Sequence, residues 1–176
     1  MKIVKNCILL AALTFGSCQN YLDVIPDNMA TIDNAFAMRN VAERYLFTCY
    51  SWMPYHNSIG GNPAFFGGHE LWPIPNNTDP TWSLPRGQQN AQSPIANYWD
   101  GQNNGRNMYQ AIRDCNIFLE NIDRVPDMEE YEKDRWRAEV KFLKAYYHFW
   151  LFQLYGPIEL VDESLPIDAD IDEIRG

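Results

Sequence analysis

The sequence has few basic residues, few histidines and few cysteines. Its 14 lysines and arginines face 23 aspartates and glutamates, which gives a net charge of −9. A surface of this sign repels nucleic acid and anionic lipid, so neither is expected as an electrostatic partner. The three histidines, His56, His69 and His148, are isolated, and neither they nor the cysteines have the spacing of a metal site.

Catalytic motifs are missing as well. The sequence contains no Gly-x-Ser-x-Gly turn for a nucleophilic serine and no glycine-rich phosphate loop. Paired carboxylates that hydrolyse glycosides act at a fixed separation across a cleft, which the sequence does not place. The acidic cluster near residue 130 is interpreted as the solvated start of a helix. We therefore expect a non-enzymatic protein without a cofactor.

Long apolar runs are also absent, apart from one short run at the start of the chain. Lys2 and Lys5 precede an almost wholly apolar stretch at residues 7–15. This stretch is too short to span a bilayer as a helix, so residues 1–17 are interpreted as an export signal.

Cys18 directly follows this signal, after Phe15-Gly16-Ser17. The junction resembles the lipobox of bacterial lipoproteins, although Phe15 stands where leucine is usual. The resemblance implies that the Cys18 thiol receives diacylglycerol, that the signal is cut before it, and that the new amino terminus is acylated. Each buried methylene of an acyl chain contributes about 0.8 kcal/mol, so several chains anchor the protein without a spanning helix. The alternatives are an ordinary secretory signal or a core cysteine.

Apolar periodicity predicts three helices. Residues 32–53 have apolar residues at alternating spacings of three and four, with Thr31 as the N-cap and Pro54 at the end. Residues 107–125 carry a similar stripe, which ends before Pro126. Cys49 and Cys115 lie on these two stripes, so we expect small core residues there. A disulfide between them in an exported protein is left open.

The third predicted helix, residues 128–155, is the clearest. Asp127 and Glu130 resemble a capping box, and Gly156-Pro157 is a strong stop. Its second half is apolar nearly all round, so neighbours are expected to cover most of its sides. His148 lies in this half and is interpreted as a core histidine rather than a ligand. Residues 157–161 are expected to form a short strand or an extended segment.

A long irregular stretch, residues 54–93, separates the first two helices and is rich in Gly, Pro and Asn. Loops of this length are usually functional or mobile. Aromatic rings stack on sugar rings, while amides and carboxylates bond the hydroxyls. The candidate ligand-binding residues of this kind are Tyr55, His69, Glu70, Trp72, Asn76, Asn77, Asp79 and Trp82. The alternative is that the rings only pin the loop to the helices.

Three segments together resemble the SusD/RagB family of nutrient-uptake lipoproteins of Bacteroidota. Residues 18–28 combine a cysteine with Tyr-Leu-Asp and a proline. Residues 138–147, Ala-Glu-Val-Lys-Phe-Leu-Lys-Ala-Tyr-Tyr, resemble the family's Ala-Glu-x-(Arg/Lys)-Phe-Leu-(Arg/Lys)-Ala-Tyr-Tyr helix. Residues 154–161 resemble its Leu-(Phe/Tyr)-Gly-x-(Val/Ile)-Pro-Leu motif, with Glu159 where proline is commoner. The order and spacing of the three segments make the match specific.

The resemblance implies a mainly α fold, a scaffold of tetratricopeptide-like helical hairpins with a long irregular insertion. Ala145, Phe149 and Pro157 fit the Ala-x3-Phe…Pro spacing of such repeats. We expect residues 18–30 to be a lipidated extended segment and residues 31–176 a SusD-like helical domain. Family members are longer, and the third helix needs more cover than two shorter helices supply. The chain is therefore expected to be the N-terminal part of a larger SusD-like fold.

The implied function is capture of glycan or another large nutrient at the cell surface. The lipoprotein would be anchored in the outer membrane, facing outward, and would pass its ligand to a SusC-type TonB-dependent transporter under a closing lid. Two alternatives stay open: a lipid-anchored tetratricopeptide-like scaffold for protein partners, and the helical front of a glycoside-active enzyme.

Overall fold

The computed structural model describes residues 32–55, 83–103 and 105–166. All of them belong to the second of the two units into which the chain divides, Ile32–Gly176. These residues form helices and no β-strand, which confirms the mainly α expectation. The elements are α2 (Ile32–Ala35), α3 (Arg39–Ser51), α5 (Met108–Asn121), the 3-10 helix η2 (Ile122–Arg124) and α6 (Glu130–Tyr155).

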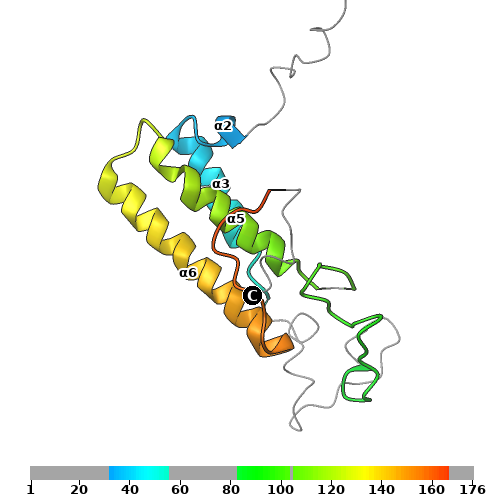
Figure 1. The fold of residues 1–176 in the computed structure, drawn as a ribbon. Helices are drawn as coiled ribbons and strands as arrows, with labels where there is room; N and C mark the ends of the chain where they lie inside the picture. The colour runs from blue at the N-terminus through cyan, green and yellow to red at the C-terminus, as the bar shows by residue number, and fades with distance from the viewer. Residues whose placement is uncertain (1–31, 56–82, 104, 167–176) are drawn as a thin grey trace, which may run out of the picture. The chain divides into compact units, whose positions relative to one another are not determined.

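Helices α5 and α6 run antiparallel, side by side, and α3 packs against both (Figure 1). Each helix contributes side chains at helical spacing to one buried cluster, and burying each large apolar side chain contributes about 1.5–3 kcal/mol. The shared core includes Ala42, Leu46 and Cys49 from α3, Ile112, Cys115 and Phe118 from α5, and Val140, Leu143, Tyr147 and Leu151 from α6.

The first predicted helix is interrupted. The structure has α2 and α3 in place of one continuous helix, and Met38 between them is exposed with an extended backbone. The chain turns there because Phe36 is buried, with its ring 5.3 Å from the Tyr45 ring and 5.8 Å from the Phe118 ring. Because Phe36 packs into the core, the chain leaves the helical path after Ala35. The single helix that the periodicity predicts is therefore divided into α2 and α3.

The capping box predicted for the third helix is wrong. Helix α6 begins at Glu130, and its N-cap Glu129 makes no side-chain capping bond. Asp127 Oδ1 instead accepts a hydrogen bond of 2.7 Å from the backbone N–H of Arg39, the first residue of α3. The partner is 88 residues away in sequence, so local spacing does not reveal it. The predicted stop is confirmed, because α6 ends at Tyr155 and the C-cap residue Gly156 has a φ of 79°.

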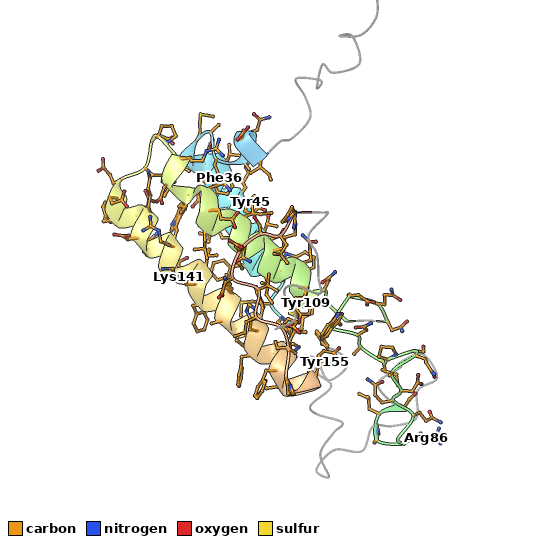
Figure 2. All side chains as sticks on the ribbon, in the orientation of Figure 1. Phe36, Tyr45, Arg86, Tyr109, Lys141 and Tyr155 are labelled. Carbon is orange, nitrogen blue, oxygen red and sulfur yellow. The ribbon has the colours of Figure 1, made fainter. Side chains whose placement is uncertain are left out.

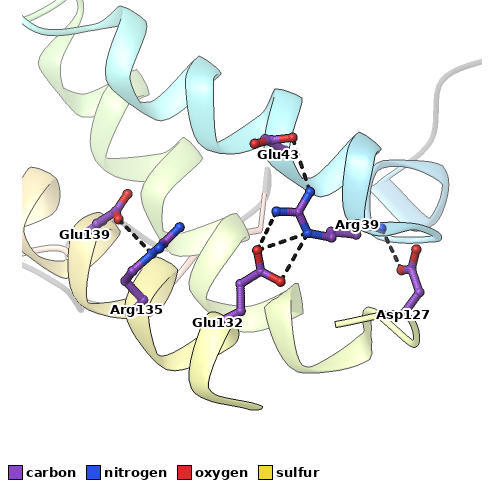
Figure 3. Close-up of polar contacts among 6 residues, drawn as sticks. All are labelled: Arg39, Glu43, Asp127, Glu132, Arg135 and Glu139. Carbon is purple, nitrogen blue, oxygen red and sulfur yellow. Dashed lines mark hydrogen bonds and ion pairs between the residues drawn. The ribbon is translucent and has the colours of Figure 1, made fainter. Parts of the chain in front are cut away.

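Arg39 also joins the first turns of α3 and α6 through its side chain (Figure 3). Its Nε donates to both carboxylate oxygens of Glu132, at 3.0 and 3.1 Å. The guanidinium lies 5.3 Å from the centre of the Trp136 ring. The hydrogen bond from Arg39 holds the pKa of Glu132 below its usual value.

Residues 157–166 form no strand and cross α5 and α6 as an extended segment. Helix side chains bond mainly to the main chain of this segment, and Glu120 and Lys144 also contact the side chains of Ser164 and Asp162. Asn116 Nδ2 donates to Val161 O at 3.2 Å, Arg113 Nη1 to Leu165 O at 2.6 Å, and Lys144 Nζ to Asp162 O at 2.8 Å. Glu120 accepts from the Ser164 N–H at 2.7 Å. Of the two conformations expected for residues 157–161, a short strand or an extended segment, the structure has the extended segment.

One face of α6 remains uncovered by the described residues. Phe142, Phe149 and Phe152 are 66%, 53% and 56% exposed along it. The expected cover on most sides of α6 is thus absent from the part of the chain described. Within that part, no helix combines the length and the apolar character needed to cross a membrane.

Candidate ligand-binding site

Most of the predicted ligand-binding residues lie outside the described residues. This holds for the predicted lipidation site Cys18 and for His69, Glu70, Trp72, Asn76, Asn77, Asp79 and Trp82. Tyr55 is described and is 62% exposed. The Arg106 guanidinium lies 4.3 Å from the centre of its ring, and Arg106 Nη1 donates to Ser51 O at the end of α3. Arg106 therefore packs against the Tyr55 ring and links it to α3.

A surface pocket of about 560 Å³ lies where residues 89–99 meet the end of α6. Aromatic and apolar side chains line it together with amides, and none of the lining residues carries a charge. The lining residues are Gln89, Asn90, Ala91, Pro94, Asn97, Trp99, Leu154 and Tyr155. We call it the Trp99 pocket.

Trp99 is the half-exposed ring of this pocket, at 44% exposure. Its ring centre lies 4.8 Å from that of Tyr109 and 5.6 Å from that of Tyr155, with interplanar angles of 65° and 88°. Tyr109 is the second residue of α5 and Tyr155 is the last of α6, and Figure 2 shows the two at the same end of the helices. Edge contacts of this kind are favourable for aromatic pairs. Two tyrosines thus hold the indole ring while much of it stays open to solvent.

The main chain beside Trp99 is fixed to both long helices. The Tyr98 N–H donates to the Tyr155 hydroxyl at 2.9 Å, and Tyr98 O accepts from the Met108 N–H at 3.0 Å. The Tyr98 ring is buried 5.6 Å from the Trp150 ring. Burial raises the pKa of Tyr155, so this hydroxyl stays protonated at neutral pH. Trp99 is therefore carried on a rigid segment.

The segment that carries Trp99 also contains unusual backbone conformations. Ala96 and Asn103 have positive φ values of 52° and 50°, and Ala96 N–H donates to Asn103 O at 2.7 Å. A Cβ on Gly105 would lie 1.8 Å from the Asn97 carbonyl oxygen, so only glycine fits there. Left-handed backbone at residues other than glycine is costly and is concentrated at functional sites.

The amide side chains of the pocket differ in how many of their hydrogen-bonding groups remain available to a ligand. Gln89 is occupied by the main chain of Ile95, to which Nε2 donates at 3.1 Å and from which Oε1 accepts at 2.6 Å. Asn90 Oδ1 accepts from the Ser93 N–H at 2.7 Å, while its Nδ2 makes one long contact of 3.4 Å to Gln88 O. An amide nitrogen carries two N–H donors. Asn90 therefore retains donor capacity for a ligand hydroxyl.

Sequence reasoning missed Trp99, because the predicted site ended at Ser93. The run Asn97-Tyr98-Trp99-Asp100-Gly101 places two aromatic residues between turn-forming residues. That pattern is a local signal for an ordered loop whose aromatic rings are fixed in place, and here Tyr98 is buried while Trp99 is exposed.

His148 lies outside the Trp99 pocket and has a structural role, as its core assignment predicts. The ring is buried, its Nε2 accepts from the Val161 N–H at 3.2 Å, and its Nδ1 lies 2.9 Å from Lys144 O. This pattern requires the neutral tautomer with the proton on Nδ1, and burial lowers the pKa of the ring. Among the described residues, no group of three or more His, Cys, Asp or Glu side chains could hold a metal ion.

The fold and the pocket define a helical protein with a surface pocket lined by aromatic, apolar and amide side chains. In a comparison with protein families, residues 20–176 match the SusD-like family described as "Starch-binding associating with outer membrane". The match covers most of the chain, and the chain therefore belongs to the SusD-like family. A comparison with curated proteins finds no match.

Proposed function

We propose that this chain binds neutral glycan in the Trp99 pocket as part of an outer-membrane uptake system. The SusD-like family is one of glycan-binding proteins associated with the outer membrane, and this membership carries the proposal. The half-exposed Trp99 ring, supported by two tyrosines, is the observation that supports this location.

The chemistry of the pocket suits an uncharged sugar. An exposed indole face packs on the apolar C–H face of a pyranose ring, and the Asn90 amide can donate to a hydroxyl group. Because the lining carries no charged side chain, it offers no counter-ion for an acidic sugar. The protein acts by binding alone, and the bound glycan passes unhydrolysed to a SusC-type TonB-dependent transporter.

The proposal includes a lipid anchor at Cys18, with the protein on the outer face of the outer membrane. Labelled-palmitate incorporation in the native cell tests the anchor, because a labelled band that disappears in Cys18→Ala requires acylation at this residue. Co-purification of an outer-membrane β-barrel with this protein tests the proposed transfer of glycan to a transporter. An unlabelled band would leave a secreted protein and remove the anchor from the proposal.

Calorimetric titration with maltooligosaccharides tests the binding site itself. Trp99→Ala should weaken binding, whereas Tyr131→Ala removes an equally aromatic but distant ring of 74% exposure and should not. Trp72→Ala and Trp82→Ala test the site that the sequence predicts in residues 54–93. Loss of binding in these two variants alone would move the site to that segment.

A protein-interaction scaffold is a second candidate function. The exposed face of α6 favours it, together with an apolar groove of about 350 Å³ lined by His148, Phe149, Phe152, Pro157, Ile158 and Leu160. Exposed apolar surface of this kind marks interaction sites. Absence of glycan binding and of any co-purifying β-barrel would favour this candidate.

A further inference from the structure

The exposed face of α6 carries residues at a regular spacing. Exposed side chains recur there at alternating intervals of three and four residues, at Arg135, Ala138, Phe142, Ala145, Phe149 and Phe152. This spacing is that of helices that pack knobs into holes, with their axes about 20° apart. At 1.5 Å per residue, the six residues span about 25 Å of the helix. We call this row of side chains the α6 seam.

The α6 seam lies on the side of the helix opposite the core. The side chains that α6 buries in the core include Trp136, Val140, Leu143, Tyr147 and Leu151. With 3.6 residues per turn, these residues and the seam lie on opposite sides of the helix. The three phenylalanines of the seam are each more than half exposed. A helix that is apolar on two opposite sides requires a packing partner on each.

The side chains of the seam complement those of a second, antiparallel copy of the same seam. Each phenylalanine can then face a small or a cationic side chain of the other copy, in the pairs Phe142–Ala145, Phe149–Ala138 and Phe152–Arg135. Arg135 Nε lies 3.6 Å from an oxygen of Glu139 on its own helix (Figure 3), so the guanidinium already has a counter-charge. A guanidinium over an aromatic ring is favourable.

Other arrangements of two copies fit less well. Parallel helices would place each phenylalanine against itself and each alanine against itself, which crowds some layers and leaves gaps in others. An antiparallel pair shifted by seven residues in either direction would oppose two aromatic rings, Phe142 with Phe152 or Phe149 with Tyr131. The unshifted antiparallel register opposes no two rings of the seam.

We propose that two copies of this chain associate through the α6 seam as an antiparallel, two-fold symmetric dimer. A two-fold interface uses the same surface of both copies, so association stops at two. The dimer goes beyond the proposed function, because none of the residues that line the Trp99 pocket belongs to the seam. Each copy therefore keeps its own pocket.

Analytical ultracentrifugation of the full chain tests the dimer. The wild-type chain should sediment with about twice its mass of 20.5 kDa. Phe142→Glu places a charge in the interface and should raise the dissociation constant at least about tenfold. Phe47→Glu is the matched control, because Phe47 lies on α3 and is 62% exposed against 66% for Phe142. It should leave the dimer intact, and circular dichroism should show that both variants remain helical.

A charge pair across the interface tests the register. Ala145→Arg alone should weaken the dimer as Phe142→Glu does. The double variant should regain it, because each new carboxylate then faces a new guanidinium of the other copy. Double variants that stay monomeric, where each single variant is monomeric too, would overturn the antiparallel register.

A monomeric wild-type chain, or a dimer that Phe142→Glu leaves intact, would overturn the proposal. Hydroxyl-radical labelling of the seam phenylalanines then shows what covers them. Protection in a monomer would mean that another segment of the same polypeptide covers the seam, and labelling would leave the seam to a different protein. Glycan titration is measured separately, so failure of the dimer and failure of the proposed function are distinguished.

Discussion

The Trp99 indole ring lies edge-on to the Tyr155 phenol ring, with 5.6 Å between their centres and 88° between their planes. The same tyrosine accepts a hydrogen bond from the N–H of Tyr98, the residue before Trp99. The last residue of α6 thus positions both the ring of the pocket and the main chain that carries it.

Trp99→Ala should weaken glycan binding by about tenfold, which corresponds to about 1.4 kcal/mol of lost binding free energy. The substitution removes the exposed ring face without touching the buried core, so the helical circular dichroism should stay unchanged. Titration with maltooligosaccharides measures the effect, with Tyr131→Ala as the control. Unchanged affinity in Trp99→Ala would place the glycan elsewhere.

Tyr155→Phe should lower the free energy of unfolding by about 1 kcal/mol, because the part-buried Tyr98 N–H loses its acceptor. The ring contact with Trp99 is retained, so the change isolates the hydroxyl. Urea unfolding measures the loss, and faster hydrogen exchange at the Tyr98 amide locates it. Tyr131→Phe, on an exposed ring, is the control and should leave the unfolding curve as it is.

Gly105→Ala should displace the segment that carries Trp99. The added Cβ would lie 1.8 Å from the Asn97 carbonyl oxygen, and a backbone atom cannot move aside by rotation of a side chain. We expect lost glycan binding and a lower melting temperature with the helices retained. Gly87→Ala is the matched control, since its Cβ meets open space and only its positive φ of 70° carries a cost, about 1 kcal/mol. Equal behaviour of the two variants would contradict the prediction.

The protein should lose stability as the pH falls through the range in which His148 titrates. Burial lowers the pKa of His148 below its ordinary value of 6.5, so the unfolded state binds the proton more readily than the folded state does. The stabilising contribution is complete above this ordinary value and is lost as the pH falls from there toward the folded pKa. The positive charge of Lys144 also lowers the pKa of His148, whereas the hydrogen bond to the Lys144 carbonyl and the charge of Asp162 raise it.

Urea unfolding at pH values above and below that range measures the effect of His148. Other groups of this acidic chain also titrate on acidification, so His148→Gln is compared at the same pH values. The wild-type chain should lose more stability on acidification than the variant does. Parallel pH dependence of the two chains would show that His148 contributes nothing.

The sequence predicts those parts of the fold that depend on residues close together in the chain. The helical periodicity and the Gly156 stop are local, so the second and third helices lie close to their predicted ranges, and the first is found in two parts, α2 and α3. The break at Phe36 depends on its packing against Phe118, and Asp127 caps a helix 88 residues away. Neither relationship leaves a signal in local spacing. The Trp99 pocket likewise depends on residues distant in sequence, because it forms only where residues 89–99 meet the end of α6.

The extended segment 157–166 is held mainly through its backbone. Helix residues supply the side chains Asn116, Arg113, Lys144 and Glu120, and the segment supplies carbonyl and N–H groups that every residue except proline possesses. The course of the segment is thus encoded in the helices beneath it. Among its own side chains, Ile158 and Val161 pack against the core, so we expect substitutions there to disturb the path of the chain more than substitutions at the exposed Leu160.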